Sequence, residues 1–135
     1  MSIKPSAFMQ SLIGISLVAG REIMAIYATD FASKAKGDLT PVTEADEAAE
    51  RIILDGLAKL DSSIPVISEE AASAGRIPET SDRFFLVDPL DGTKEFISRN
   101  GEFTVNIALV EQGLPVLGLV YVPVADLLYL SLIHI

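Results

Sequence analysis

Residues 84–96 constrain the fold of this chain more than any other stretch, because an apolar run changes there into charged and turn-forming residues. Residues 84–87 (Phe-Phe-Leu-Val) have the composition of a buried strand. Pro89 fixes its own φ and favours an extended backbone at Asp88, so we expect the strand to end with Asp88 at its carboxyl edge. The sequence therefore predicts a core strand that delivers an acidic side chain to the edge of a sheet.

A second carboxylate, Asp91, follows three residues later, across a predicted tight turn. Gly92 lets a backbone come close to a bound group, and Thr93 is expected to open a short helix whose amides can receive a phosphate oxygen. Two carboxylates about 4 Å apart repel by roughly 4 kcal/mol at an effective dielectric near 20, which a bound cation offsets. Oxygen ligands favour a hard ion such as Mg²⁺. From the residues alone, the alternative is an Asp-Pro turn in which Asp91 caps a helix.

The stretch 64–70 has the same form, a short apolar strand followed by Glu69 and Glu70. Adjacent glutamates are commonly solvated surface residues, which is the alternative interpretation. Ligands of α/β sheets gather at the carboxyl ends of strands. If both strands belong to one sheet, we expect the two acidic pairs to meet at one site.

Four stretches together resemble the inositol monophosphatase superfamily, and within it the branch of CysQ-type 3′(2′),5′-bisphosphate nucleotidases. They are residues 41–46 (Pro-Val-Thr-Glu-Ala-Asp), 66–70 (Val-Ile-Ser-Glu-Glu), 88–96 (Asp-Pro-Leu-Asp-Gly-Thr-Lys-Glu-Phe) and 99–109 (Arg-Asn-Gly-Glu-Phe-Thr-Val-Asn-Ile-Ala-Leu). The family signature of an Asp, a Glu-Glu pair and Asp-Pro-Leu/Ile-Asp-Gly-Thr is matched in order. Residues 94–96 and 99–109 favour the nucleotidase branch over the inositol branch. The resemblance extends to about Tyr129.

The resemblance implies a metal-assisted phosphomonoesterase that uses two or more Mg²⁺ ions. The implied metal ligands are the side chains of Glu69, Asp88 and Asp91 and the main-chain carbonyl of Leu90. The implied catalytic residues are Glu70 and Thr93, which orient or deprotonate the attacking water, and Asp46, which supports Thr93. The implied substrate contacts come from Glu69, Leu90, Asp91, Gly92 and Thr93, with the Gly92 and Thr93 amides on the phosphate. Lys36, in a predicted loop, is either a further phosphate contact or a solvated surface lysine.

The implied substrate is adenosine 3′,5′-bisphosphate (PAP), which would give AMP and phosphate, or its sulfated precursor (PAPS), which would give APS. The alternatives are hydrolysis of inositol or sugar phosphates and a cation-binding fragment without turnover. Lithium sensitivity is a further implied property. A net charge of −9 argues against polynucleotide partners, although it permits a small nucleotide held through cations. The oligomeric state is left open.

The expected fold is α+β, and with the resemblance it is the N-terminal half of a layered α/β sandwich of the inositol monophosphatase and fructose-1,6-bisphosphatase type. Helical spacing predicts a first helix over residues 6–27, whose apolar run 12–19 is too short to span a bilayer. A signal peptide is the alternative for this segment. Thr43 is expected to cap a second helix, with Asp46 as its partner in a weak capping box. Residues 103–110 and 116–122 predict a hairpin, so two helices would pack on a mainly antiparallel sheet.

Residues 1–129 are expected to form the metal-binding half of a phosphatase domain. Residues 130–135 depart from the family pattern, so we expect an aberrant tail on a truncated chain. In the family, a second half of comparable length supplies a further metal ligand and much of the nucleotide-binding wall. The absence of cysteine is typical of a cytoplasmic protein, and a peripheral position at the inner face of the membrane is left open.

Overall fold

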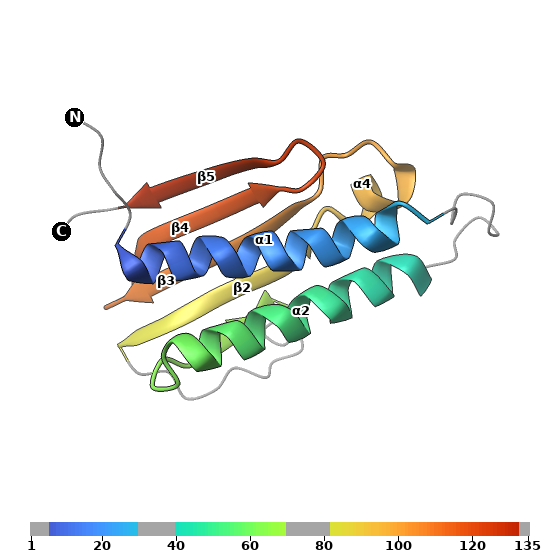
Figure 1. Cartoon of the computed structure of the whole chain (residues 1–135). Coiled ribbons are helices and arrows are strands. Elements are labelled where there is room, and N and C mark those ends of the chain that lie inside the picture. The colour runs from blue at the N-terminus through green and yellow to red at the C-terminus, as the bar shows by residue number, and fades with distance from the viewer. Residues whose placement is uncertain (1–5, 30–39, 70–81, 133–135) are drawn as a thin grey trace.

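The computed structural model describes residues 6–29, 40–69 and 82–132. Its elements are α1 (Ala7–Tyr27), α2 (Thr40–Leu60), β1 (Val66–Ser68), β2 (Arg83–Asp91), α4 (Thr93–Ser98), β3 (Thr104–Glu111), β4 (Leu114–Val122) and β5 (Leu127–Leu132). Two long helices lie side by side over one face of a sheet, and the short α4 lies at one end of it (Figure 1). The predicted α+β fold with two helices on a sheet is confirmed.

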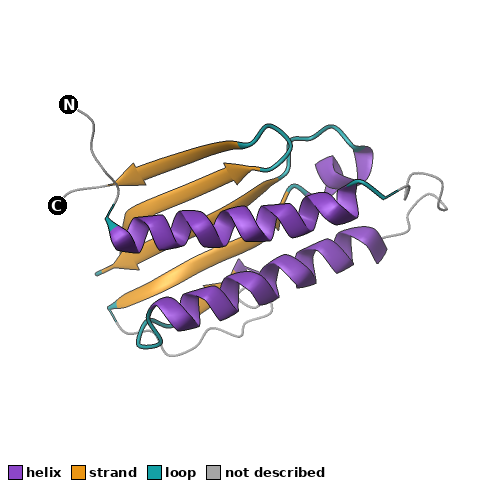
Figure 2. Ribbon diagram, viewed as in Figure 1, coloured by secondary structure: helices purple, strands orange, loops and turns teal. Residues whose placement is uncertain are grey.

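The five strands form one sheet in which each strand lies beside its neighbour in sequence, in the order β1-β2-β3-β4-β5 (Figure 2). β1 runs parallel to β2, and the other neighbours are antiparallel. Because Ser68 at the end of β1 lies opposite Val87, the chain leaves β1 beside Asp88. The predicted hairpin is also confirmed, since β3 and β4 are joined through Gln112 and Gly113, which both have a positive φ.

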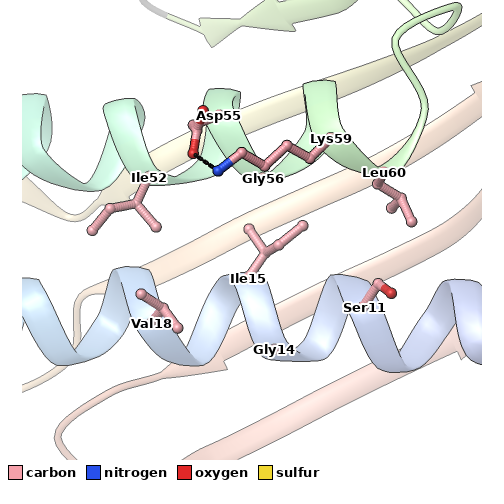
Figure 3. Close-up of a pocket in the computed structure, with 9 residues that line it drawn as sticks. All are labelled: Ser11, Gly14, Ile15, Val18, Ile52, Asp55, Gly56, Lys59 and Leu60. Carbon is pink, nitrogen blue, oxygen red and sulfur yellow. Dashed lines mark ion pairs between the residues drawn. The ribbon is translucent and has the colours of Figure 1, made fainter.

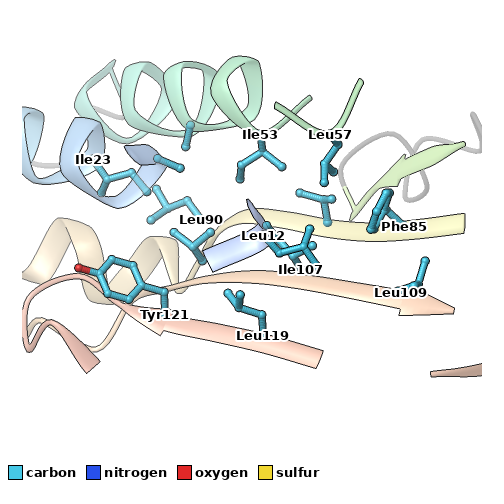
Figure 4. Packing of buried hydrophobic residues seen from close by; sticks show 14 of the residues in the cluster. Leu12, Ile23, Ile53, Leu57, Phe85, Leu90, Ile107, Leu109, Leu119 and Tyr121 are labelled. Atoms are coloured by element: carbon cyan, nitrogen blue, oxygen red, sulfur yellow. The ribbon is translucent and has the colours of Figure 1, made fainter. Parts of the chain in front are cut away.

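A hydrophobic core fills the space between the helix pair and the sheet (Figure 4). Successive side chains of a strand face opposite sides, so Phe85 and Val87 of β2 are buried in this core whereas Leu86 between them is 42% exposed. Leu12 and Ile23 of α1 enter the core from the helix layer. On the opposite face of the sheet, no helix of the described segments covers the strands.

Helix α1 begins at a capped N-terminus and matches its prediction. Ser6 has an extended backbone, and its Oγ accepts a hydrogen bond from the Met9 amide at 3.2 Å. The run 12–19 is too short to span a bilayer, but the whole of α1 is long and apolar enough to do so by length and composition. Its inner face, which includes Leu12 and Ala19, is fully buried. Core packing therefore accounts for the apolar residues of this face.

Helix α2 begins earlier than predicted. It starts at Thr40, so the expectation that Thr43 caps this helix is wrong. Pro41 is the second helical residue, where the fixed φ of proline suits the first turn and its missing N–H costs nothing. Asp46 consequently lies inside the helix, past its first turn, as a half-buried residue.

Strand β5 continues past the expected domain limit. Leu130 lies opposite Leu119, and Leu132 lies opposite Leu117, so β5 pairs with β4 up to its last residue. Residues 130–132, which we assigned to a tail, are therefore part of the edge of the sheet. The expectation that the chain is truncated stays a prediction.

Candidate metal-binding site

A bulge in β2 brings Asp88 and Asp91 to the same face of the sheet. Asp88 lies opposite Asn106 of β3, and Asp91 lies opposite Thr104, so β2 has one residue more than β3 between these two pairs. Both intervening residues of β2 are buried. An extra residue in one strand shifts the alternation of its side chains. Asp91 can therefore face the same side as Asp88 although three positions separate them.

The prediction that the strand ends at Asp88 and leads through a tight turn to Asp91 is wrong. β2 runs on through Pro89 to Asp91. Proline has no N–H to give to the ladder and is tolerated at a bulge, so the irregular pairing accommodates Pro89 without ending the strand. The two carboxylates approach each other through a bulge and not through a turn.

Asp88 is the centre of a crowded group of negative charges. Its half-buried carboxyl is hydrogen-bonded to that of Glu69, and the charge of Asp91 also acts on it. Burial, together with the hydrogen bond and charge of Glu69 and the charge of Asp91, raises the pKa of Asp88 to about 7. A carboxyl group that keeps its proton to neutral pH marks a place where a cation would be stabilised.

Asn106 is a polar residue of this site to which we assigned no role from the sequence. Its Nδ2 donates a hydrogen bond to Asp91 Oδ2 at 3.1 Å, and its Oδ1 accepts one from Thr104 Oγ1 at 3.3 Å. The signal was present in the alternation of β3, where the buried Val105 and Ile107 flank Asn106. That alternation places Asn106 on the face that carries Asp88.

These side chains border a hollow of about 310 Å³ on the sheet face that points away from α1 and α2. Glu69, Asp88 and Asn106 supply its polar lining. Its apolar lining includes Leu86, Ala108 and Val120. The hollow thus combines side-chain oxygens that could bind a cation with an apolar wall.

A larger hollow of about 700 Å³ lies between α1 and α2 (Figure 3), and none of Glu69, Asp88 and Asp91 lines it. Apolar side chains such as Ile15 and Val18 line most of it. The charged side chains there, Asp55 and Lys59, form an exposed ion pair with each other at 3.0 Å. The acidic residues predicted as metal ligands, Glu69 and Asp88, thus line the smaller hollow and not the larger one.

Comparison with known proteins decides the family. The profile of the inositol monophosphatase family matches residues 5–133. The chain belongs to the inositol monophosphatase family. The 3′(2′),5′-bisphosphate nucleotidase CysQ of Salmonella typhimurium (strain LT2) is 56% identical over 113 residues, which cover 82% of this chain and 46% of that protein. The chain therefore spans about half the length of the curated relatives it matches.

Solved structures of the family have the same fold. The crystal structure of CysQ from Bacteroides thetaiotaomicron matches with a TM-score of 0.75 at 43% identity, over 91% of this chain and 45% of that one. The crystal structure of 2′AMP-bound SaIMPase-II matches with a TM-score of 0.77 at 26% identity, over 96% of this chain and 46% of that one. The sequence comparison and the structure comparison thus give the same family.

The structure places most of the residues expected from the family signature. Glu69 and Asp91 both act on Asp88. The Leu90 side chain is buried in the core, and its main chain donates a hydrogen bond to the Asp88 carboxyl. Thr93 is exposed at the start of α4, and Asp46 lies in α2, the helix that packs against α4. Glu70 and Lys36 lie outside the described residues.

The donor chemistry fits a hard divalent cation, because Glu69, Asp88 and Asp91 offer oxygen atoms alone. The geometry fits in part. Among residues 6–29, 40–69 and 82–132, no three acidic, histidine or cysteine side chains converge closely enough to hold an ion as they stand. The Glu69 carboxyl is engaged with that of Asp88. A cation would therefore have to displace the Asp88 proton and draw the neighbouring carboxylates inward.

Gly92 forms the backbone joint between the acidic strand and α4. Its φ of +100° lies in the left-handed region, which glycine adopts without a steric penalty. A Cβ atom at this position would lie 3.1 Å from Glu95 Oε2 and 3.2 Å from Phe103 Cα. Both the backbone conformation and the close packing therefore require glycine.

Replacing Gly92 by Ala is expected to lower the free energy of unfolding by about 2–3 kcal/mol, since left-handed strain and a tight contact with the backbone add. Gly113→Ala is the matched control, because Gly113 also has a positive φ but a Cβ there would meet nothing within 4 Å. The free energy of unfolding of Gly113→Ala should fall by about 1 kcal/mol from backbone strain alone. Urea unfolding measures both values, and equal losses would contradict the packing role of Gly92.

An arginine and an aromatic cluster fix α4 to the end of α1. The Arg99 guanidinium donates hydrogen bonds to the main-chain carbonyls of Tyr27, at 3.0 Å, and of Thr29, and lies 5.3 Å from the Tyr27 ring centroid. The rings of Tyr27, Phe96 and Phe103 pack against one another with centroids 4.9 to 5.3 Å apart. This packing holds the segment that carries Gly92 and Thr93 in place beside the acidic residues.

Proposed function

We propose that this chain carries the cation-binding part of a phosphomonoesterase that hydrolyses the 3′-phosphate of adenosine 3′,5′-bisphosphate to give AMP and phosphate, and converts PAPS to APS. The observation that carries the proposal is the crowding of Glu69 and Asp91 around Asp88, which raises the pKa of Asp88 to about 7. The likeness to proteins named 3′(2′),5′-bisphosphate nucleotidase supports the choice of substrate. A structure of the family with bound 2′AMP is consistent with a nucleotide ligand.

In this proposal each residue of the family signature has a role. Glu69, Asp88, Asp91 and the Leu90 carbonyl would hold two or more Mg²⁺ ions, which would supply a lowered pKa of water and neutralise charge on the phosphate. Glu70 and Thr93 orient or deprotonate the attacking water, and Asp46 supports Thr93. The amides of Gly92 and Thr93 receive a phosphate oxygen, and Glu69, Leu90 and Asp91 complete the contacts to the substrate.

The charge of the chain supports a requirement for cations. The net charge is −9, and the substrate carries two phosphates. Like charges repel most strongly where water is partly excluded, as at the half-buried Asp88. Bound Mg²⁺ would reverse the sign of the local field and let the anionic substrate approach. A cytoplasmic location, where both Mg²⁺ and nucleotides are available, belongs to the same proposal.

The alternative functions each have an observation in their favour. Inositol or sugar phosphate hydrolysis is favoured by the match to an inositol monophosphatase structure from Staphylococcus aureus. A cation-binding chain without turnover is favoured by the uncovered sheet, where Leu86 is 42%, Val120 37% and Tyr129 60% exposed. Exposed apolar strands promote association, and the curated relatives are about twice as long.

A phosphate-release assay distinguishes these functions. It compares the 135-residue chain with a fusion of the chain to the C-terminal half of the Salmonella relative, on adenosine 3′,5′-bisphosphate and on inositol 1-phosphate. We expect Mg²⁺-dependent, lithium-sensitive release from the bisphosphate, at least about 10-fold faster than from the inositol phosphate. The fusion with Asp91→Asn is the control that should be inactive.

Each outcome of this assay has one meaning. A preference for inositol phosphate would replace the nucleotidase function by the inositol one. Activity in the fusion but not in the 135-residue chain would show that the chain has no turnover by itself. Absence of activity in both proteins would overturn the proposed function.

A further inference from the structure

We propose that Asn106 is a positioning residue for cation binding, because its side-chain amide holds the Asp91 carboxylate in the orientation that faces Asp88. The inference rests on the proposed function, since it concerns the same acidic residues. It assigns a role to a side chain that lies outside the family signature.

The hydrogen bonds of Asn106 fix one oxygen of Asp91. Asn106 Nδ2 donates to Asp91 Oδ2 at 3.1 Å. A carboxylate has two oxygens, so this bond leaves Oδ1 available to a cation. Asp91 is exposed at the end of β2, where an unrestrained side chain would lose rotamer freedom on binding. Holding it beforehand removes part of that entropic cost.

Thr104 in turn fixes the orientation of the Asn106 amide. Thr104 Oγ1 donates to Asn106 Oδ1 at 3.3 Å, so the NH₂ group must be the end that faces Asp91. A carboxylate cannot donate to an amide oxygen, which makes this orientation the one that satisfies both partners. Thr104, Asn106 and Asp91 thus form a short chain of hydrogen bonds that ends at a proposed metal ligand.

The position of Asn106 in the sheet explains why a neutral donor suits it. Asn106 lies opposite Asp88 in the ladder, and Asp91 lies opposite Thr104. An acidic side chain at position 106 would add a negative charge opposite Asp88, and an apolar side chain would leave Asp91 without this hydrogen bond. An amide restrains Asp91 without adding charge. Groups that orient a metal ligand in this way typically change metal affinity by 10- to 100-fold.

A purely structural role for Asn106 makes a different prediction. If the amide served only to hold the bulge between β2 and β3, its loss would lower the stability of the metal-free chain and leave the cation affinity of the folded protein unchanged. A positioning role predicts a lower cation affinity of the folded protein and an unchanged stability of the metal-free chain. The two roles can therefore be separated by measuring stability and affinity on the same variants.

The experiment titrates the 135-residue chain with Mn²⁺ as a paramagnetic substitute for Mg²⁺ and measures free Mn²⁺ by electron paramagnetic resonance. The variants are Asn106→Leu, which removes the donor, and Thr104→Val, which keeps the β-branched shape but removes the hydroxyl. Asn100→Leu is the matched control, because Asn100 Oδ1 accepts a hydrogen bond from the Glu102 amide at 3.0 Å in a turn outside the acidic group. Urea unfolding without metal is measured in parallel.

We expect the Mn²⁺ dissociation constant to rise about 10- to 100-fold in Asn106→Leu and by a smaller factor in Thr104→Val, with no change in Asn100→Leu. If Asn106→Leu does not fold, Thr104→Val still tests the inference. Parent-like affinity in the folded variants would overturn the role of Asn106 and leave the proposed function intact. Failure of the parent chain to bind Mn²⁺ would overturn both.

Discussion

Replacing Asp88 by Asn is expected to lower Mg²⁺ affinity by at least about 100-fold and, at the same time, to make the metal-free chain more stable at pH 8. The affinity falls because the substitution removes a charged oxygen ligand from the centre of the site. The stability rises because the substitution removes a half-buried negative charge that Glu69 and Asp91 repel. Opposite effects on binding and on stability are characteristic of a site selected for function.

The pH dependence of this effect follows from the direction of the pKa shift. The pKa of Asp88 rises from 3.8 to about 7 on folding, so the folded protein binds more protons than the unfolded chain between these values. The stability that protonated Asp88 contributes to the parent chain is therefore complete below about pH 4 and is lost as the pH rises through about 7, which is where Asp88→Asn gains its advantage. Because Asp88 is partly exposed, we expect water to reduce the loss to about 1 kcal/mol, or about 3–4 °C in Tm.

Thermal unfolding of the metal-free protein from pH 4 to pH 9 measures this effect. The parent chain should lose stability across this range by more than Asp88→Asn does. Glu47→Gln, which makes the same change in net charge at an exposed position of α2, controls for the overall negative charge. If stability falls with pH equally in the parent and in Asp88→Asn, the negative charge of Asp88 does not destabilise the folded chain.

Phe103→Ala is expected to lower the free energy of unfolding by about 3–5 kcal/mol. Phe103 has no exposed surface, and its ring lies 4.9 Å from that of Tyr27 and 5.2 Å from that of Phe96. Truncation removes these ring contacts and leaves a cavity next to Gly92. We therefore expect the cation site to be perturbed together with the core, since α4 rests on this cluster.

Urea unfolding of Phe103→Ala, compared with two further variants, separates its cavity from its aromatic contacts. Phe103→Leu retains most of the volume and should lose about 1–1.5 kcal/mol. Leu114→Ala, at a residue that is 52% exposed on β4, should change stability by about 0.5 kcal/mol. A loss in Phe103→Ala no larger than that in Leu114→Ala would contradict the central place of this cluster in the core.

The elements that could be predicted from the sequence are those whose cause is local. The helical spacing of apolar residues predicts α1 over nearly its full length, Ala7–Tyr27. The β3–β4 hairpin follows from two alternating strands around a turn with Gly113. The meeting of Glu69 and Asp88 was predicted because two strands of one sheet were expected to end in acid, and β1 and β2 are indeed parallel neighbours.

The features that were missed depend on contacts between distant segments or on competing local signals. The bulge that turns Asp91 toward Asp88 is a property of the pairing with β3, which the sequence of β2 does not contain. The start of α2 differs from the prediction because Thr43 is a good capping residue by type, whereas the first turn of the helix already contains Pro41, a residue that suits this position. Asn106 was overlooked because its partner Asp91 lies fifteen residues away along the chain.

Several predicted roles stay predictions. The water-orienting role of Glu70 and the phosphate contact of Lys36 lie outside the described residues. Thr93 and Asp46 are placed on neighbouring elements, α4 and α2, which are in contact. Their roles depend on a bound phosphate and bound ions, so they belong to the tests of the proposed function.

Proton release on Mg²⁺ binding tests the cation site around Asp88 most directly. Isothermal titration calorimetry in two buffers with different ionisation enthalpies counts the protons that leave for each bound ion. Because Asp88 holds its proton up to about pH 7, we predict the release of about one proton at pH 6 and about none at pH 9. Absence of Mg²⁺ binding at both pH values, or binding at pH 6 without proton release, would contradict a cation site centred on Asp88.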